Sequence, residues 1–203
     1  MAHPHPLPPA TQSQIDTLDL AIVKRRKQKW YRIHHSNHTP LFYGCSGHRF
    51  DSARNAFGTL YIASELAGAF AETFCRKLGV NRIARRALES KSFSVLETDE
   101  LNLIDIAGPG AVRAGIDGRL CTEVAYAALT RPWTDAFHRH KAHADGLLYK
   151  ARHDLNETVA AIFERAKHKI RVAETISFST RKGKLLIAPI LAKYKVAIIP
   201  SRP

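Results

Sequence analysis

The sequence has few cysteines and no long apolar run. Cys45, Cys75 and Cys121 are widely spaced and odd in number, so neither a disulfide framework nor a paired zinc motif can be assembled from them alone. No window approaches the ~18 uninterrupted apolar residues that a membrane helix needs. Prolines and histidines stand where a signal peptide would have its hydrophobic stretch. We therefore expect a cytoplasmic protein that does not insert into membranes.

Acidic residues are also scarce relative to basic ones. Asp and Glu number 18 against 31 Lys and Arg, which gives a formal net charge of +13. Such a charge attracts polyanions, and these could be nucleic acid, a dinucleotide pyrophosphate or an acidic protein partner. The densest run, KRRKQK at 24–29, is typical of a solvated basic face but would also suit phosphate contacts.

The composition favours a single domain with a short N-terminal arm. A chain of 203 residues with 45% hydrophobic content can fill one core. Residues 1–14 are rich in proline and polar side chains, so we expect a disordered arm there. Residues 15–203 contain no repeat and no linker-like segment, and we expect them to form one domain.

The apolar pattern predicts short strands and helices in irregular alternation. A helix from Ser64 to Gly79 is favoured because apolar residues recur there every four positions. Strands are predicted at 30–34, 59–63, 93–97, 101–106, 147–149, 159–163, 172–178 and 196–199, and further helices at 82–88, 123–129, 133–142 and 184–194. The order predicts an α+β fold, with a mixed central sheet flanked by helices.

Several short motifs combine polar and aromatic residues in a fixed order. WYR at 30–32 is followed by HRFD at 48–51, FGTLYIA at 57–63 and AFAETF at 69–74. ADGLLYKARHD at 144–154 and VAAIFERA at 159–166 come later in the chain. Together these segments resemble the RES domain, a family named for an arginine, a glutamate and a serine.

The resemblance implies a fold similar to that of ADP-ribosyltransferases and a role as the toxin of a toxin–antitoxin pair. Such toxins consume NAD by hydrolysis, phosphorolysis or ADP-ribosyl transfer. The family's arginines fall on Arg32 and Arg49, its tyrosine on Tyr61 and its glutamate on Glu72. Its serine position falls on Ala151, which departs from the pattern and puts the role of that hydroxyl in doubt.

The resemblance also implies partners. NAD is the expected substrate and no metal is expected. An Xre-type antitoxin is the expected protein partner, and nucleic acid would be reached only through the antitoxin complex. A homo-oligomer remains open.

The chemistry of these residue types fits cleavage of a nicotinamide–ribose bond. That cleavage leaves an oxocarbenium-like sugar cation, which the carboxylate of Glu72 could stabilise. The forked guanidinium groups of Arg32 and Arg49 could bind the pyrophosphate from two sides. Tyr61 could offer its ring to the flat nicotinamide, and Ala151 stands where the family has a further hydrogen-bond donor.

Each candidate also has an ordinary structural interpretation. Arg32 could be a surface charge at a strand end, and Tyr61 a half-buried core residue. Glu72 lies nearly opposite the apolar stripe of its helix, so it is either solvated or turned towards a cleft. The histidines at 34, 35 and 38 and at 138, 140 and 143 are interpreted as surface residues, whereas His48 and His153 could line a cleft.

Two alternatives to an active NAD-consuming toxin remain open. The substitution at Ala151 is compatible with a catalytically weakened RES module that binds or regulates. A basic nucleic-acid-binding protein would use the runs at 24–29 and 82–86 on phosphates. No helix-turn-helix, zinc finger or aromatic RNA-binding motif supports the second alternative.

Overall fold

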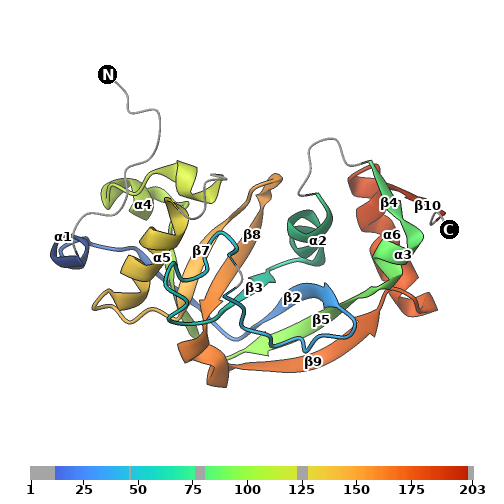
Figure 1. Ribbon diagram of the computed structural model, residues 1–203, viewed down its shortest axis with the longest axis horizontal. Coiled ribbons are helices and arrows are strands. Elements are labelled where there is room, and N and C mark those ends of the chain that lie inside the picture. The colour runs from blue at the N-terminus through green and yellow to red at the C-terminus, as the bar shows by residue number, and fades with distance from the viewer. Residues whose placement is uncertain (1–11, 46, 76–80, 123–127, 201–203) are drawn as a thin grey trace.

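The computed structural model describes residues 12–45, 47–75, 81–122 and 128–200 and confirms an α+β fold (Figure 1). Its strands are β1 (Ile22–Arg25), β2 (Gln28–His35), β3 (Thr59–Ala63), β4 (Arg82–Ala84), β5 (Lys91–Thr98), β6 (Leu101–Asp105), β7 (Gly146–Ala151), β8 (Asp154–Phe163), β9 (Ile170–Ser177) and β10 (Ala197–Ile199). Its α-helices are α1 (Gln12–Asp16), α2 (Leu66–Phe74), α3 (Arg85–Glu89), α4 (Pro109–Arg113), α5 (Thr130–Arg139) and α6 (Arg181–Lys193).

One large mixed sheet organises the described residues. Its strand order is β1-β6-β7-β8-β3-β2-β5-β9, with β6 and β7 parallel and the other neighbours antiparallel. Strands β4 and β10 form a separate parallel pair beside α3 and α6 (Figure 1). Helix α2 crosses the middle of the large sheet, with α4 and α5 towards one end and α6 towards the other.

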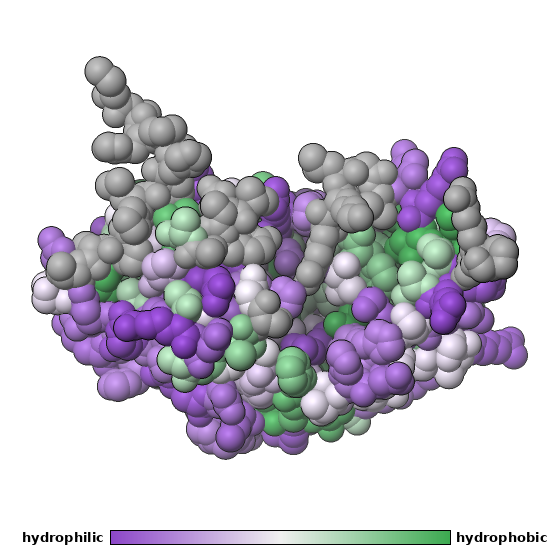
Figure 2. All heavy atoms as spheres, in the orientation of Figure 1, coloured by the Kyte–Doolittle hydropathy of each residue, from purple (hydrophilic) through white to green (hydrophobic). Residues whose placement is uncertain are grey.

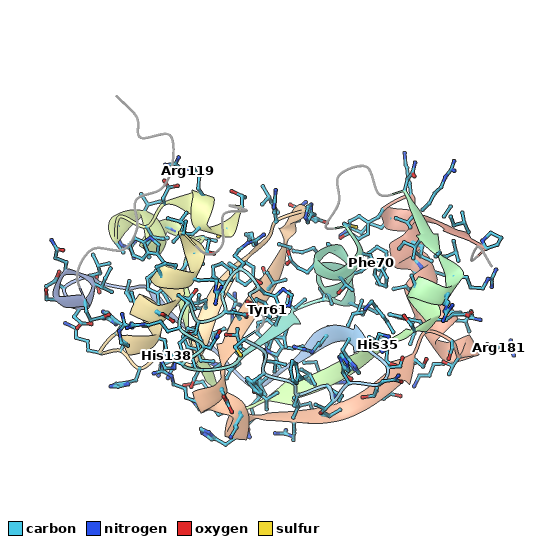
Figure 3. The ribbon with its side chains drawn as sticks, in the orientation of Figure 1. His35, Tyr61, Phe70, Arg119, His138 and Arg181 are labelled. Atoms are coloured by element: carbon cyan, nitrogen blue, oxygen red, sulfur yellow. The ribbon has the colours of Figure 1, made fainter. Side chains whose placement is uncertain are left out.

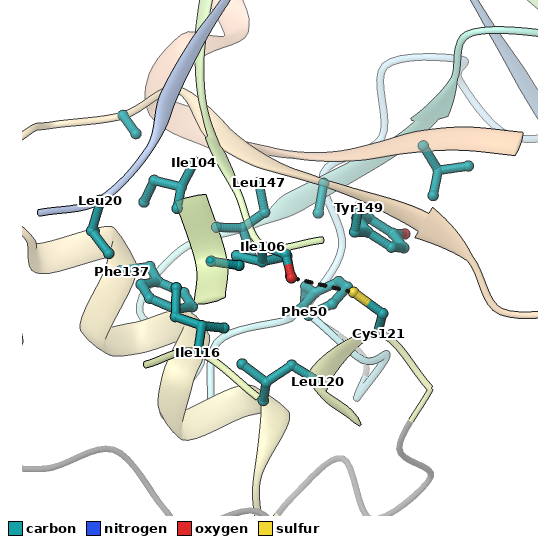
Figure 4. Close-up of a cluster of buried hydrophobic side chains, with 14 of the residues drawn as sticks. Leu20, Phe50, Ile104, Ile106, Ile116, Leu120, Cys121, Phe137, Leu147 and Tyr149 are labelled. Atoms are coloured by element: carbon teal, nitrogen blue, oxygen red, sulfur yellow. Dashed lines mark hydrogen bonds between the residues drawn. The ribbon is translucent and has the colours of Figure 1, made fainter. Parts of the chain in front are cut away.

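Both faces of the central strands are buried, which explains their short continuous apolar runs. On β7, Leu147 and Tyr149 pack into one cluster, whereas Leu148 packs into the cluster on the opposite face. Figure 4 shows the first cluster, in which α5 contributes Phe137 and the loop before β3 contributes Phe50. A third cluster joins α2, β5, β9 and α6.

Small residues let α2 pack tightly on the sheet. A Cβ atom on Gly68 would lie 3.2 Å from the Cβ atoms of Ala63 and Glu157. Ala69 and Ala71 are buried on either side of Phe70, which is completely buried. The close approach brings the second half of α2, with Glu72, next to the ends of β7 and β8.

The strand and helix predictions hold for most of the described residues; besides α4, where no helix was predicted, three assignments are corrected. Residues 22–25 form β1, although no strand was predicted there because the segment overlaps the basic run at 24–29. Residues 82–84 pair with β10 as β4, so the predicted helix at 82–88 begins only at Arg85. Residues 12–14, assigned to the arm, lie in α1, which buries Ile15. Three predictions fall partly outside the described residues: the N-terminal arm at 1–11, the end of the first predicted helix at Gly79, and residues 123–127 of the helix predicted at 123–129.

Candidate functional site

A cleft in the middle of the molecule gathers four of the five predicted site residues. Its empty volume of about 1130 Å³ includes the open mouth. Figure 2 shows the hollowed middle of this face, between the α5 half and the α2–α6 half. The lining residues come from β2, the loop before β3, β3, α2, and the hairpin between β7 and β8, and they include Arg32, Phe42, His48, Arg49, Tyr61, Glu72, Thr73, Tyr149, Arg152 and His153.

Arg32 enters the cleft where the large sheet opens. Strands β2 and β3 share a single residue pair, Tyr31 with Ala63, so the strands diverge beside it. The Arg32 guanidinium donates from Nη1 to the carbonyl oxygen of Tyr61 at 3.3 Å and from Nη2 to that of Phe42 at 3.3 Å. The side chain therefore satisfies backbone carbonyls that have no strand partner there, and its charge reaches the cleft.

The charge of Arg32 is poorly compensated. Burial lowers the pKa of Arg32 to about 10, so the group stays protonated at neutral pH. Among the described residues, no carboxylate lies within ion-pair distance of Arg32, and its Nε has no hydrogen-bond partner. A partly desolvated cation of this kind at the wall of a cleft favours an anionic ligand.

Asp51 holds the loop before β3 against Tyr61. Its carboxylate is fully buried and accepts hydrogen bonds from the backbone N–H groups of Gly47 at 2.9 Å and His48 at 2.8 Å. The Tyr61 hydroxyl donates to the other Asp51 oxygen at 2.8 Å and accepts from the backbone N–H of Phe50 at 2.9 Å. Burial and then the nearby Asp51 raise the pKa of Tyr61 well above 10, so the hydroxyl remains a donor.

The Asp51–Tyr61 contact places two aromatic rings at the cleft wall. The rings of His48 and Tyr61 meet edge to face with centroids 5.9 Å apart. Figure 3 shows Tyr61 near the centre of the molecule, between α5 and the helix that carries Phe70. A planar ring in the cleft would find these two aromatic side chains beside it.

Arg49 is held by helix α5. Its side chain is only 7% exposed yet lines the cleft, and its Cζ atom lies 5.9 Å from the centre of the Phe50 ring. Its carbonyl oxygen accepts a hydrogen bond of 2.6 Å from the Thr130 hydroxyl. Asp135, also on α5, accepts from the Ser52 hydroxyl at 2.7 Å. The helix thus fixes the backbone that carries Arg49.

Glu72 faces the cleft from α2 rather than bulk solvent. One carboxylate oxygen accepts a hydrogen bond of 3.0 Å from the backbone N–H of Arg152 in the β7–β8 hairpin. Arg152 and its neighbour His153 also line the cleft. The helical pattern allowed Glu72 to be solvated or to face a cleft. Its hydrogen bond to the hairpin shows that it faces the cleft.

Ala151 lies apart from the other predicted site residues. It is completely buried in the same cluster as Tyr149 and is not among the residues that line the cleft. Its neighbour Arg152 takes the position at the cleft wall. The geometry therefore brings together Arg32, Arg49, Tyr61 and Glu72 but leaves Ala151 beneath them.

Sequence reasoning assigned no role to three residues that build the site. Asp51 was part of the quoted HRFD motif, and its spacing of three residues from His48 is a signal of a side chain that closes a turn. Arg152 acts on Glu72 through its backbone, which no side-chain pattern reveals. Phe42 is 53% exposed at the cleft, where an isolated aromatic residue in a loop gave no signal.

His38 and His143 are exposed as predicted, whereas the other four histidines that were predicted to lie at the surface are partly or mostly buried. His34 is 7% exposed and contacts the Ser94 hydroxyl at 2.9 Å, and His140 is 3% exposed, so the surface interpretation is wrong for both. They are buried because β2 turns His34 towards β5 and because His140 closes the end of α5. Among the described residues, no group of three or more His, Cys, Asp and Glu side chains could hold a metal ion.

The basic run at 24–29 does not form one continuous face. Lys24 and Arg25 end β1, whereas residues 28 and 29 begin β2. Lys24 pairs with Glu100 at 3.6 Å and Lys27 with Asp99 at 3.7 Å, which partly neutralises the run. In the part of the chain that the structure describes, no helix is long and apolar enough to cross a membrane.

Comparisons with known proteins agree with the fold and with the resemblance to the RES domain. A chain in the crystal structure of the M. tuberculosis MbcT–MbcA toxin–antitoxin complex aligns with a TM-score of 0.63 and 14% identity, covering 89% of this chain and 96% of that one. A search of curated proteins finds no match. The model of the RES domain matches residues 29–181, well over half of the sequence. This chain therefore belongs to the RES domain family.

Proposed function

We propose that this protein is a toxin that binds NAD in the central cleft and breaks its nicotinamide–ribose bond. The observation that carries the proposal is the convergence of Arg32, Arg49, Tyr61 and Glu72 on one cleft. These residues come from four successive parts of the RES domain, namely β2, the loop before β3, β3 and α2. Two guanidinium groups, an aromatic ring and a carboxylate match the pyrophosphate, the nicotinamide and the ribose of one ligand.

The two arginines suit the pyrophosphate. Arg32 brings a cation without a carboxylate partner among the described residues, and Arg49 brings a second one from the loop that α5 fixes. Charge-assisted hydrogen bonds from a guanidinium fork to phosphate oxygens hold a ligand in one orientation. The pyrophosphate would thereby be anchored while the reacting bond lies towards Glu72.

Glu72 suits the ribose. As the C1′–N bond breaks, nicotinamide leaves with the bonding electron pair and positive charge develops on the sugar. A fixed carboxylate stabilises that charge, and the Arg152 N–H holds the Glu72 carboxylate in place before reaction. The oxygen of an acceptor, which is water, phosphate or a protein side chain, then bonds to C1′ and releases its proton to solvent. Tyr61 and His48 would flank the nicotinamide ring.

A protein that destroys NAD requires control, and an antitoxin is the expected means. The structural neighbour comes from a toxin–antitoxin complex, which supports an antitoxin partner here. The net charge of +13 suits an acidic partner segment. We propose an antitoxin of the Xre type, through which the complex would reach nucleic acid.

Nicotinamide release from NAD by the purified protein tests the proposal. Glu72→Gln keeps an acceptor for the Arg152 N–H but removes the charge, so release should fall at least ~100-fold. Glu65→Gln is the matched control, because Glu65 is exposed one residue before the same helix and makes no capping hydrogen bond. Equal release by the parent and Glu72→Gln would refute the role of Glu72, and no release by the parent would refute the activity.

The alanine at position 151 supports a second candidate, a RES module with weakened catalysis. One hydrogen-bond donor near developing charge is worth roughly 3 kcal/mol, or about a hundredfold in rate. Ala151 is buried and does not line the cleft, so Ala151→Ser tests whether a hydroxyl at this position acts on the reaction at all. Nicotinamide release faster than that of the parent and of Ala161→Ser, a control in the paired strand of the same buried cluster, would support weakened catalysis through position 151. A parent that binds NAD in calorimetry but releases no nicotinamide would favour this candidate.

A further inference from the structure

The C-terminal end of α6 contacts two elements that build the cleft. The ring of Tyr194 stacks on the ring of Phe70 in α2, with centroids 5.7 Å apart and planes inclined by 7°. The Tyr194 hydroxyl donates to Asp154 at 2.8 Å, where β8 begins. A single side chain therefore holds the helix that carries Glu72 and the hairpin that carries Arg152.

Lys193 strengthens the contact with the hairpin. Its ammonium group donates to Glu157 at 2.6 Å and lies 3.1 Å from Asp154. Glu157 is only 8% exposed, whereas the Lys193 side chain is 46% exposed, so the pair is shielded from water on the carboxylate side. The hydrogen bond to Glu157 raises the pKa of Lys193. Burial alone would raise the pKa of Asp154, but the hydrogen bonds from Tyr194 and Lys193 outweigh burial and lower this pKa. Lys193 and Asp154 are therefore both ionised at neutral pH.

These contacts join the two elements that carry Glu72 and its hydrogen-bond donor. Phe70 lies two residues before Glu72 on α2, and Asp154 lies two residues after Arg152 in the hairpin. Glu72 and Arg152 are joined by a hydrogen bond of 3.0 Å on the cleft side. On the outer side, Tyr194 joins the same two elements. The spacing between α2 and the hairpin is thus fixed from both sides.

We infer that Lys193 and Tyr194 are positioning residues that set the place of Glu72 in the cleft. Neither residue is among those that line the cleft. The inference rests on the proposed function, because it assigns them to the support of Glu72 in that reaction. A displacement of about 1 Å from a distant change can cost a reaction up to ~100-fold in rate. Loss of this outer contact should act on turnover more than on binding.

Two substitutions test the inference with little change in volume. Tyr194→Phe keeps the stacked ring and removes the hydrogen bond to Asp154, and Lys193→Met removes the ammonium group. Each should lower kcat about tenfold and leave KM within about twofold, and Lys193→Arg should restore most of the rate. Lys184→Met is the matched control, since it removes another lysine–glutamate pair of α6, with Glu89 at 2.8 Å, away from the hairpin.

Hydrogen exchange of the Arg152 amide gives a readout that needs no activity. Followed by NMR on the protein without NAD, this exchange should be faster in Tyr194→Phe and Lys193→Met and unchanged in Lys184→Met. Glu72→Ala, which removes the acceptor, marks the expected upper limit. If the parent releases no nicotinamide, the exchange data still test the contact, so the two proposals fail separately. Unchanged exchange, or faster exchange with an unchanged kcat, would overturn the inference.

Discussion

The two edges of strand β2 differ sharply although they belong to the same eight residues. Towards β5 the strand pairs along its whole length, from Gln28 with Thr98 to His35 with Lys91. Towards β3 it makes one pair and then diverges. The first edge is an ordinary antiparallel ladder, and the second edge opens into the cleft. The candidate site lies where β2 and β3 no longer pair with each other, and where the Arg32 side chain binds backbone carbonyl groups instead.

The difference shows how one strand serves both stability and binding. Trp30 and Arg32 lie two positions apart on the same face of β2. Trp30 is completely buried in the apolar cluster with Leu60 and Leu96, whereas Arg32 replaces missing strand pairing with hydrogen bonds to carbonyl oxygens. Changes at the paired edge should therefore unfold the protein, and changes at the open edge should remove the ligand.

The largest expected effect is on the paired edge. Trp30→Ala should reduce the free energy of unfolding by about 3–5 kcal/mol, because it leaves a cavity between β2, β3 and β5. Trp30→Phe should cost less, since the buried indole N–H has no hydrogen-bond partner among the described residues. Chemical denaturation measures both, and equal stability of Trp30→Ala and the parent would contradict this account of β2.

Much of the paired part of the sheet could be predicted from the sequence. The β3 prediction at 59–63 agrees with the structure at both ends, because β-branched and aromatic residues stand there between turn signals. Strand β1 was missed because it carries the charged residues Lys24, which is exposed, and Arg25, which is half-buried, on an edge strand where charge does not prevent pairing. Residues 82–84 are a strand only because β10, more than a hundred residues later, pairs with them.

The open edge was harder to predict. Arg32, Glu72 and the HRFD motif were recognised as candidates from residue type and order. These residues come together in the cleft because β2 diverges from β3 and because the Arg152 N–H binds Glu72. Neither feature can be recognised from a short stretch of sequence. Long-range register and backbone donors are properties of the folded chain, so sequence reasoning named the side chains but not the contacts that position them.

The second prediction concerns the open edge. Arg32→Met should weaken NAD binding by about 10- to 100-fold, because one charge-assisted phosphate contact is lost. Stability should fall by no more than about 2 kcal/mol, since the lost hydrogen bonds are offset by removal of a desolvated charge. Calorimetric titration with NAD and denaturation measure the two effects. Arg181→Met, far from Tyr61 in Figure 3, is the exposed control.

The third prediction concerns the loop that faces the open edge. Tyr61→Phe removes one donor from the buried Asp51 carboxylate and the acceptor of the Phe50 N–H, so it should cost about 1–2 kcal/mol of stability. Because the pKa of Tyr61 is raised well above 10, the parent should show no Tyr61-dependent loss of nicotinamide release between pH 7 and pH 9. A loss in that range that disappears in Tyr61→Phe would contradict this protonation state.

The smallest effect is expected at His138 on α5, which stacks on Phe57 at 3.7 Å between ring centroids and lies well away from Tyr61 in Figure 3. Burial, and then the nearby Arg165, lower the pKa of His138 from its ordinary 6.5 to about 4. As the pH falls from 6.5 towards 4, the unfolded chain therefore binds a proton that the folded protein does not, and stability declines. His138→Phe keeps the stacked ring and should make this decline shallower, as thermal unfolding at several pH values would reveal. His168→Phe, at an exposed position, controls for removal of a histidine. If both variants lose stability with falling pH as steeply as the parent, protonation of His138 does not cause the loss.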